Sequence, residues 1–242
     1  MYLFFAYYGK YKACRRNVYK WAGILIYKEI TMKQILCFGD SNTYGLVPGT
    51  KNRYDWKIRW SGILQEKLLK QGYRIAEEGL CGRTTVFQDP VRNGRKGADC
   101  LPFLLETHHP IDIIILMLGT NDCKTVYNAS SEVIGKGMEC LLDQIEQKAP
   151  QSKVVLVSPI LLGDGIWEKE YDPEFDRRSV ETSKRLPEVY RKIAEKHGAY
   201  YLPASRYASP SKRDREHLDE EGHKNLAAAL LNLLEGVIGN GY

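Results

Sequence analysis

The sequence predicts a three-layer α/β/α sandwich around a five-stranded parallel sheet. Two observations predict this fold class. Short β-branched runs alternate with segments of helical periodicity between residues 34 and 238. Two of the runs, 111–118 and 153–160, are almost continuously apolar, which is typical of strands covered by helices on both faces. We find neither an internal repeat nor a second core, so we expect residues 32–242 to form one domain.

The predicted strands are short and bounded by Gly, Pro, Asn or Asp, and they span 34–38, 73–76, 111–118, 153–160 and 199–202. The predicted helices span 60–70, 98–106, 130–148, 178–197 and 219–238. Crossovers between parallel strands are right-handed, so every loop that leaves the carboxyl end of a strand lies at one edge of the sheet. Open α/β sheets carry their functional sites at that edge.

Residues 1–31 differ from the rest of the chain. They hold six Lys or Arg against one acid, together with nine of the 26 aromatic residues, and they show no regular periodicity. A secretory signal would place its charges before the apolar run, whereas here Phe4 and Phe5 precede the charges. A signal or membrane anchor is the alternative. We expect Met32 to be the natural start and residues 1–31 to be an N-terminal extension outside the fold.

Charge and composition argue against several functions. The net charge of +5 resides in residues 1–31, because residues 32–242 hold 29 basic and 29 acidic residues, so we expect no nucleic-acid partner. The longest apolar run has seven residues, far short of the roughly 20 that span a bilayer, so we expect no membrane partner. The six cysteines form no C-x-x-C pair and no zinc-ligand spacing. We therefore expect reduced thiols, a cytoplasmic location and no metal.

A serine follows the first predicted strand directly. The segment Gly39-Asp40-Ser41-Asn42 places Ser41 at a strand-to-helix turn, where its hydroxyl can be held exposed as a nucleophile. The same residues are also good turn and N-cap residues. Taken alone, the segment favours neither a nucleophilic serine nor an ordinary turn.

Two further loops at this edge offer hydrogen-bond donors. Asn121 follows the third strand, and its side-chain amide could donate to a developing oxyanion. Gly79 follows the second strand and could present its backbone N–H, because no side chain blocks a close approach. Both are equally compatible with ordinary turns. Asp40 and Asp122 are expected to hold their own loops in place.

A serine nucleophile needs a base, and the chain has five histidines. The three that precede strands lie at the opposite edge: His108, His109 and His197. His223 falls inside the last predicted helix. His217 is the better candidate, because Asp214, three residues earlier, can bind one imidazole nitrogen and leave the other facing Ser41.

Together, these segments resemble the four sequence blocks of the SGNH (GDSL-like) hydrolase family, in the family's order and across nearly all of residues 32–238. Residues 37–41, 59–62, 77–85 and 117–122 are most similar to the branch of bacterial arylesterases and acyltransferases. The resemblance implies the flavodoxin-like SGNH hydrolase fold. It also implies a serine hydrolase that needs neither a metal nor an organic cofactor.

The resemblance also implies the roles of individual residues. Ser41 attacks the ester carbonyl, His217 transfers the proton, and Asp214 orients the imidazole. The backbone N–H groups of Ser41 and Gly79 and the side-chain amide of Asn121 form the oxyanion hole. This gives a Ser-His-Asp triad that acts through an acyl-enzyme.

Three aromatic residues are expected to contact the substrate: Tyr44, Trp60 and Trp167. Trp167 belongs to the long segment 161–176, which could form a lid or a binding wall. In the resembling branch, acyl transfer to alcohols in water is linked to a Trp shortly after the nucleophile. Tyr44 stands at that position here, which argues against strong acyl transfer.

We therefore expect a serine esterase that hydrolyses small carboxylic esters, with some acyltransferase activity at most. The segment 43–60 could wall the pocket or meet a neighbouring subunit of a homo-oligomer. A carbohydrate O-deacetylase, a lysophospholipase or a thioesterase would use the same triad. A non-catalytic flavodoxin-like binding protein is the alternative from a different class, but it gives no reason for Asn121 and the Asp214/His217 pair to accompany Ser41.

Overall fold

The computed structural model describes residues 17–21, 24–28 and 32–239, and the chain divides into two compact units, Met1–Met32 and Lys33–Tyr242. The first unit contains an antiparallel hairpin of β1 (Asn17–Trp21) and β2 (Ile24–Lys28). The sequence did not predict this hairpin, because its strands lack alternation of polar and apolar residues. That residues 1–31 lie outside the functional fold stays a prediction.

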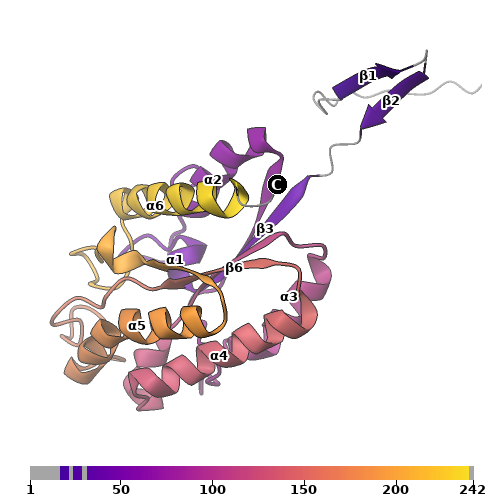
Figure 1. Cartoon of the computed structure of the whole chain (residues 1–242). Coiled ribbons are helices and arrows are strands. Elements are labelled where there is room, and N and C mark those ends of the chain that lie inside the picture. Colours follow the sequence, from indigo (N-terminus) through magenta and orange to yellow (C-terminus); the bar gives the residue numbers. More distant parts are fainter. Residues whose placement is uncertain (1–16, 22–23, 29–31, 240–242) are drawn as a thin grey trace, which may run out of the picture. The chain divides into compact units, whose positions relative to one another are not determined.

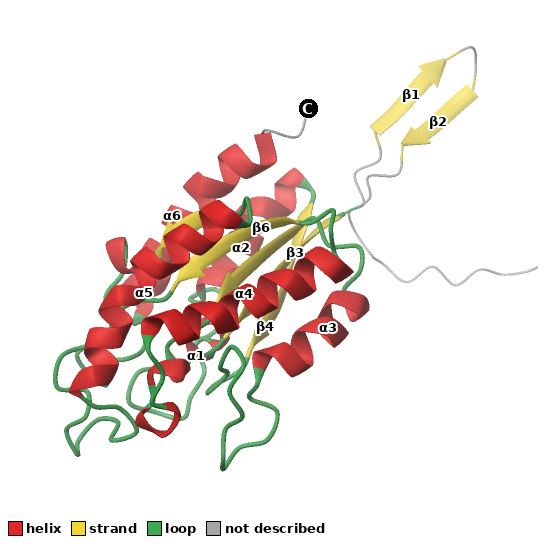
Figure 2. Cartoon of the chain, turned by 60° about the horizontal axis from the view of Figure 1, so that its bottom comes forward, coloured by secondary structure: helices red, strands yellow, loops and turns green. Residues whose placement is uncertain are grey.

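The second unit is built on a five-stranded parallel sheet with the order β4-β3-β5-β6-β7. Its strands are β3 (Lys33–Gly39), β4 (Tyr73–Gly79), β5 (Ile113–Met117), β6 (Lys153–Ser158) and β7 (Tyr200–Pro203). All five predicted strands are present. The chain order reverses beside β3, and the loops gather with the short helix α1 (Ser41–Tyr44) at one end of the strands (Figure 2).

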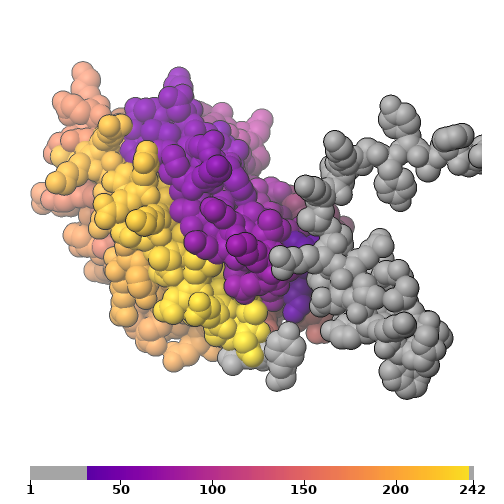
Figure 3. All heavy atoms as spheres, turned by 90° about the horizontal axis from the view of Figure 1, so that it is seen from above, coloured from indigo at the N-terminus to yellow at the C-terminus, as the bar shows by residue number. Residues whose placement is uncertain are grey.

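Helices cover both faces of the sheet (Figure 1). One face carries α2 (Trp60–Leu68) and α6 (Glu220–Gly239), which lie side by side in Figure 3 as the purple and yellow segments. The other face carries α3 (Gly97–Thr107), α4 (Ser131–Lys148) and α5 (Arg177–Lys196). The short 3₁₀ helices are η1 (Leu69–Gln71), η2 (Asn121–Cys123), η3 (Thr125–Tyr127) and η4 (Ala204–Arg206). The predicted three-layer α/β/α sandwich is therefore confirmed.

The continuously apolar strands are explained by two cores. In β5, Ile114 and Leu116 belong to the core under α3, α4 and α5, while Ile113, Ile115 and Met117 belong to the core under α2 and α6. Successive side chains of a strand point to opposite faces, so a strand buried on both sides must be apolar throughout. The described residues contain no helix long and apolar enough to cross a lipid bilayer.

The structure differs from the sequence-based prediction mainly at element ends. The strand predicted at 153–160 ends at Ser158, because Pro159 has no N–H for the ladder. The helix α1 was not predicted, since four residues are too few to show periodicity. Asp40 caps it by accepting a hydrogen bond from the backbone N–H of Asn42 at 2.9 Å, and Gly45, at φ 80°, ends it.

Candidate active site

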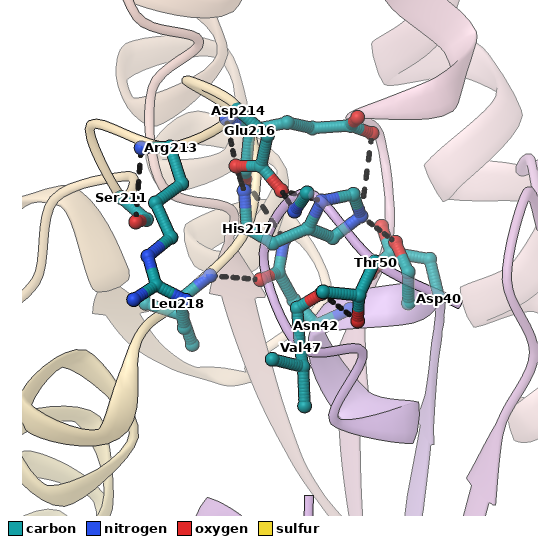
Figure 4. A network of polar contacts seen from close by, with 12 residues as sticks. Asp40, Asn42, Val47, Thr50, Ser211, Arg213, Asp214, Glu216, His217 and Leu218 are labelled. Atoms are coloured by element: carbon teal, nitrogen blue, oxygen red, sulfur yellow. Dashed lines mark hydrogen bonds and ion pairs between the residues drawn. The ribbon is translucent and has the colours of Figure 1, made fainter. Parts of the chain in front are cut away.

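Ser41 is the first residue of α1, just after the carboxyl end of β3. Its Oγ lies 2.9 Å from Nε2 of His217. The other imidazole nitrogen, Nδ1, lies 2.8 Å from Oδ2 of Asp214. The structure thus joins the three residues predicted to form a triad into one hydrogen-bonded chain, although Ser41 and His217 are 176 residues apart. Figure 4 shows the Asp214 and His217 side of this chain.

Asp214 is fixed in place by the backbone around it. Its Oδ1 accepts hydrogen bonds from the backbone N–H groups of Glu216 (3.1 Å) and His217 (3.0 Å). Its Oδ2 accepts a further hydrogen bond from the N–H of Gly49 at 2.9 Å. Burial alone would raise the pKa of Asp214, but the hydrogen bonds from His217 and the backbone keep it below its usual value. The carboxylate therefore stays ionised beside the imidazole.

The electrostatic surroundings favour a basic imidazole at His217. Burial alone would lower its pKa, but the carboxylates of Glu216, Asp214 and Asp40 outweigh this effect and raise the pKa from 6.5 to about 9. An imidazole stabilised in its protonated form is a strong proton acceptor. This is the property that a general base for a serine hydroxyl requires.

Asn42 connects the serine turn to the histidine loop. Its Oδ1 accepts a hydrogen bond from the backbone N–H of Leu218 at 2.8 Å, and its Nδ2 donates to the carbonyl of Glu216 at 3.4 Å. These bonds flank His217 on both sides, as Figure 4 shows. Sequence reasoning treated Asn42 only as a turn residue, and its side chain in fact holds Ser41 and His217 in register.

Asn121 reaches the same edge of the sheet from β5. It begins η2, is 2% exposed, and donates one amide hydrogen to the carbonyl of Arg83 at 3.2 Å. A primary amide has two N–H donors, so the second remains available for a ligand. The structure therefore allows the predicted donor role of Asn121.

The orientation of Gly79 argues against the donor role predicted for it. The N–H of Leu80 donates to the carbonyl of Gly39 at 3.1 Å, so Gly79, one residue earlier in the ladder, points its backbone groups away from β3 toward the sheet edge. A Cβ at position 79 would lie 2.2 Å from the backbone N of Tyr44. Gly79 is needed for the close approach of α1, not for a ligand.

Gly82 offers a free backbone N–H in the turn after β4, whereas the N–H of Gly79 points to the outer edge of the sheet. It adopts φ +82° in a turn closed by a 3.0 Å hydrogen bond from the N–H of Arg83 to the carbonyl of Leu80. Among the described residues, the Gly82 N–H has no acceptor. The carbonyl of the next residue, Arg83, accepts the hydrogen bond from Asn121, so Gly82 lies close to that side chain. The sequence Gly-Leu-Cys-Gly contains both candidate glycines. Gly82 can be recognised as the donor only once the end of β4 at Gly79 is known.

The structure contradicts the substrate-contacting role predicted for Trp60. Its side chain is only 1% exposed, lies in the core under α2 and α6, and donates its indole N–H to the carbonyl of Asn42 at 3.0 Å. Trp60 therefore supports the serine turn from behind.

The two other aromatic residues are only partly buried. The ring of Tyr44 stacks with the guanidinium of Arg53 at 4.1 Å. Trp167 packs beside the core under α3, α4 and α5, in the long segment after β6. Substrate contact by Tyr44 and Trp167 stays a prediction.

The two acids expected to hold loops make loop contacts. Asp40 caps α1, and Asp122 accepts hydrogen bonds from the backbone N–H of Thr85 at 2.9 Å and from the Thr85 hydroxyl. Burial raises the pKa of Asp40 to about 7 and that of Asp122 to about 6. Asp122 thus ties the turn after β4 to the loop that carries Asn121.

Sequence reasoning gave no role to Glu216, which lies beside the base. Its side chain is 8% exposed, and Oε1 lies 3.7 Å from Nε2 of His217. Figure 4 shows the side chain reaching along His217 to the nitrogen that faces Ser41. Glu216 therefore adds a third carboxylate beside His217, after Asp214 and Asp40.

Among the described residues, one group could share a metal ion: Asp143, Glu146 and His197, whose ligand atoms lie within 4.8 Å of one another. They stand at the end of α4 and just after α5, at the opposite edge of the sheet from Ser41. Both acids are exposed. We therefore assign this group no part in the chemistry of the site.

Comparison with known families identifies the family to which the chain belongs. The GDSL-like lipase/acylhydrolase family matches residues 37–225, which contain every site residue described above. No curated protein sequence is significantly similar to the chain.

Solved structures of esterases share the fold along almost their whole length. An aryl esterase from M. smegmatis is 32% identical with a TM-score of 0.78, covering 84% of this chain and 99% of its own. A carbohydrate acetylesterase from Sinorhizobium meliloti is also 32% identical with a TM-score of 0.78, covering 85% and 99%. A putative arylesterase from Agrobacterium tumefaciens is 35% identical with a TM-score of 0.75, covering 85% and 99%. The chain therefore belongs to the GDSL-like lipase/acylhydrolase (SGNH hydrolase) family and is a carboxylic ester hydrolase.

Proposed function

We propose that the protein is a serine esterase that hydrolyses small carboxylic esters through a Ser41-His217-Asp214 triad and an acyl-enzyme. The observation that carries this proposal is the hydrogen-bonded chain from Ser41 Oγ through the imidazole to Asp214, with distances of 2.9 and 2.8 Å. Nucleophile, base and orienting acid stand in the order that acyl transfer needs.

In the first half-reaction, the Ser41 oxygen attacks the carbonyl carbon of the ester while Nε2 of His217 takes the hydroxyl proton. Asp214 accepts the hydrogen bond from Nδ1–H and stabilises the imidazolium that forms. When the tetrahedral intermediate collapses, Nε2 returns the proton to the leaving alkoxide. Water then attacks the acyl-enzyme with His217 again as base, which releases the acid and restores Ser41.

We propose that three donors bind the oxyanion: the backbone N–H groups of Ser41 and Gly82 and the second amide hydrogen of Asn121. Neither backbone N–H has an acceptor among the described residues, and Asn121 uses only one of its two hydrogens on Arg83. Donors that are fixed before charge develops favour the transition state, at roughly 3 to 4 kcal/mol for one donor.

The relatives suggest two classes of substrate. Named structures of this fold include aryl esterases and a carbohydrate acetylesterase, so short-chain aryl or alkyl esters and acetylated sugars are the substrates to test first. Hydrolysis of small esters is our first candidate. A carbohydrate O-deacetylase is the second, because Glu216 gives the site a buried carboxylate that can accept a hydrogen bond from a polyhydroxylated alcohol.

The test is a kcat/KM profile for p-nitrophenyl esters from acetate to palmitate, with acetylated xylose and cellobiose alongside. We expect the highest kcat/KM at acetate or butyrate and loss of turnover in Ser41→Ala with the fold intact. A maximum at palmitate would instead indicate a lipase or lysophospholipase. Turnover in Ser41→Ala close to that of the wild type would contradict the proposed mechanism.

A further inference from the structure

Glu216 carries a buried carboxylate that the described protein leaves without a hydrogen bond. Its side chain is 8% exposed, and its single ion pair among residues 32–239 is the 3.7 Å approach to Nε2 of His217. That separation is longer than a hydrogen bond. A carboxylate with so little access to solvent and no bonded protein partner is free to accept a hydrogen bond from a ligand.

The backbone aims this side chain at the reaction centre. The N–H of Glu216 donates to Oδ1 of Asp214 at 3.1 Å, and its carbonyl accepts the hydrogen bond from Asn42. Because the peptide groups on both sides are held, the side chain has a defined direction. It ends beside Nε2 of His217, the nitrogen that also faces Ser41 (Figure 4).

Among the described residues, no charged group donates a hydrogen bond to the carboxylate of Glu216. Burial is the largest cause that raises its pKa, and Asp172 adds to this effect, whereas His217 and, more weakly, Lys124 act in the opposite direction. His217 approaches only to 3.7 Å, and the ammonium group of Lys124 is already paired with the carboxylate of Glu174. The site therefore keeps a hydrogen-bond acceptor that a bound ligand can satisfy.

We propose that Glu216 is a specificity-determining residue that accepts a hydrogen bond from a donor group on the leaving alcohol of the ester. This inference rests on the proposed triad. The leaving oxygen receives its proton from Nε2 of His217, so it must come within hydrogen-bond distance of that nitrogen. Glu216 lies 3.7 Å from the same nitrogen, which places it beside the next carbon of the alcohol and its substituents.

Two kinds of alcohol carry a donor at that position. A hydroxyl on the neighbouring carbon occurs in monoesters of polyols and sugars, and an ammonium occurs in esters of amino alcohols. Alkyl esters such as propyl acetate have neither. The enzyme is therefore selective for alcohols with a vicinal donor, whatever the acyl group.

The test compares esters of equal shape that differ in the donor. For the hydroxyl arm, kcat/KM is measured for 2-hydroxyethyl acetate and propyl acetate. For the ammonium arm, it is measured for 2-(dimethylamino)ethyl acetate and 3-methylbutyl acetate at neutral pH. We expect at least one arm to show a preference for the donor ester of about tenfold or more in the wild type, as for a hydrogen bond to a charged group.

Substitution of Glu216 separates a direct contact from a general effect. In Glu216→Leu the preference should fall close to one. In Glu216→Gln a preference for the hydroxyl should weaken and a preference for the ammonium should disappear, because the amide oxygen accepts a hydrogen bond but carries no charge. Should the leucine variant fail to fold, the glutamine variant decides. Glu146→Gln, at the opposite edge of the sheet, is the matched control and should keep the wild-type ratios.

Different results overturn the two proposals. If Ser41→Ala abolishes hydrolysis but the wild type shows no preference in either arm, the role of Glu216 is wrong and the triad stands. The same conclusion follows if both Glu216 variants keep the wild-type ratio of kcat/KM between donor ester and alkyl ester. Glu216 would then act only through the charge of His217, which changes the rates of both esters by the same factor. If Ser41→Ala hydrolyses these esters like the wild type, both proposals fail.

Discussion

The loop around His217 and the start of α6 around His223 place two histidines six residues apart in very different surroundings. Both imidazoles are buried, at 7% and 0% exposure. His217 lies between a carboxylate and a hydroxyl, and its pKa is raised to about 9. For His223, burial lowers the pKa to about 4.

The contacts of His223 explain this difference. Its Nδ1 accepts a hydrogen bond from the backbone N–H of Trp60 at 3.3 Å, and its ring meets the edge of Tyr54 with 5.4 Å between ring centroids. No carboxylate bonds to it among the described residues, so the neutral form is favoured. Burial alone therefore does not make a histidine a base. Carboxylates beside it do, through their charge and, for Asp214, a hydrogen bond.

Replacing each histidine tests the comparison most severely. We expect His217→Ala to lower kcat by several orders of magnitude, because its Nε2 is the only group among the described residues that is hydrogen-bonded to Ser41 Oγ. His223→Ala should lower the melting temperature, since it opens a cavity in the core, and should change kcat only slightly. Initial rates on p-nitrophenyl acetate, measured beside thermal melts, check both results. Equal inactivity of two folded variants would refute the difference in roles.

Asn121→Ala should have the next largest effect. We expect kcat to fall by roughly 10² to 10³ with little change in KM, because the amide acts mainly on the transition state. Asn128→Ala is the matched control, since Asn128 is a left-handed turn residue at φ 47°. A normal kcat with a loss of about 0.5 to 2 kcal/mol in stability would show that Asn121 is only a turn-capping residue.

Removing the carboxylate of Glu216 should lower the pKa of His217 toward that of His223. The charge of Glu216 is the largest single cause that raises the pKa of His217, followed by the hydrogen bond and the charge of Asp214 and by the charge of Asp40. Since the base must be neutral to act, kcat/KM should rise with pH up to about 9 in the wild type. In Glu216→Gln this acid limb should move to lower pH. An unchanged limb in a folded variant would show that Glu216 does not influence the base.

The smallest effect is expected from removal of residues 1–31. The proposed triad, the proposed oxyanion donors and the five-stranded sheet all lie within Lys33–Tyr242, which is a compact unit of its own. A chain that begins at Met32 should keep the kcat and the melting temperature of the full chain. Loss of either would mean that the first unit contributes to the enzyme.

Most of the fold could be predicted from sequence because it depends on local patterns. Apolar β-branched runs identified all five strands of the parallel sheet, and helical periodicity identified the five long helices. The helix α1 and the hairpin of β1 and β2 were missed. The first has too few residues for a pattern, and the second lacks alternation.

The errors in the site come from properties that only pairing and packing determine. Gly79 and Gly82 are both glycines near the end of β4, and only the register with β3 shows that the N–H of Gly79 points to the outer edge of the sheet. Trp60 lies in a helix whose buried face is set by α6. Glu216 was overlooked because a charged residue between Asp214 and His217 suggests solvent, whereas the loop turns it inward.

The most direct test of the central claim is to locate the nucleophile with a serine-directed fluorophosphonate. Intact mass and peptide mapping should show one label per chain, on Ser41, and the label should be absent from Ser41→Ala. Labelling should be much slower in His217→Ala but not in His223→Ala, since only His217 bonds to Oγ. A label on another serine, or equal labelling rates in both histidine variants, would contradict the account.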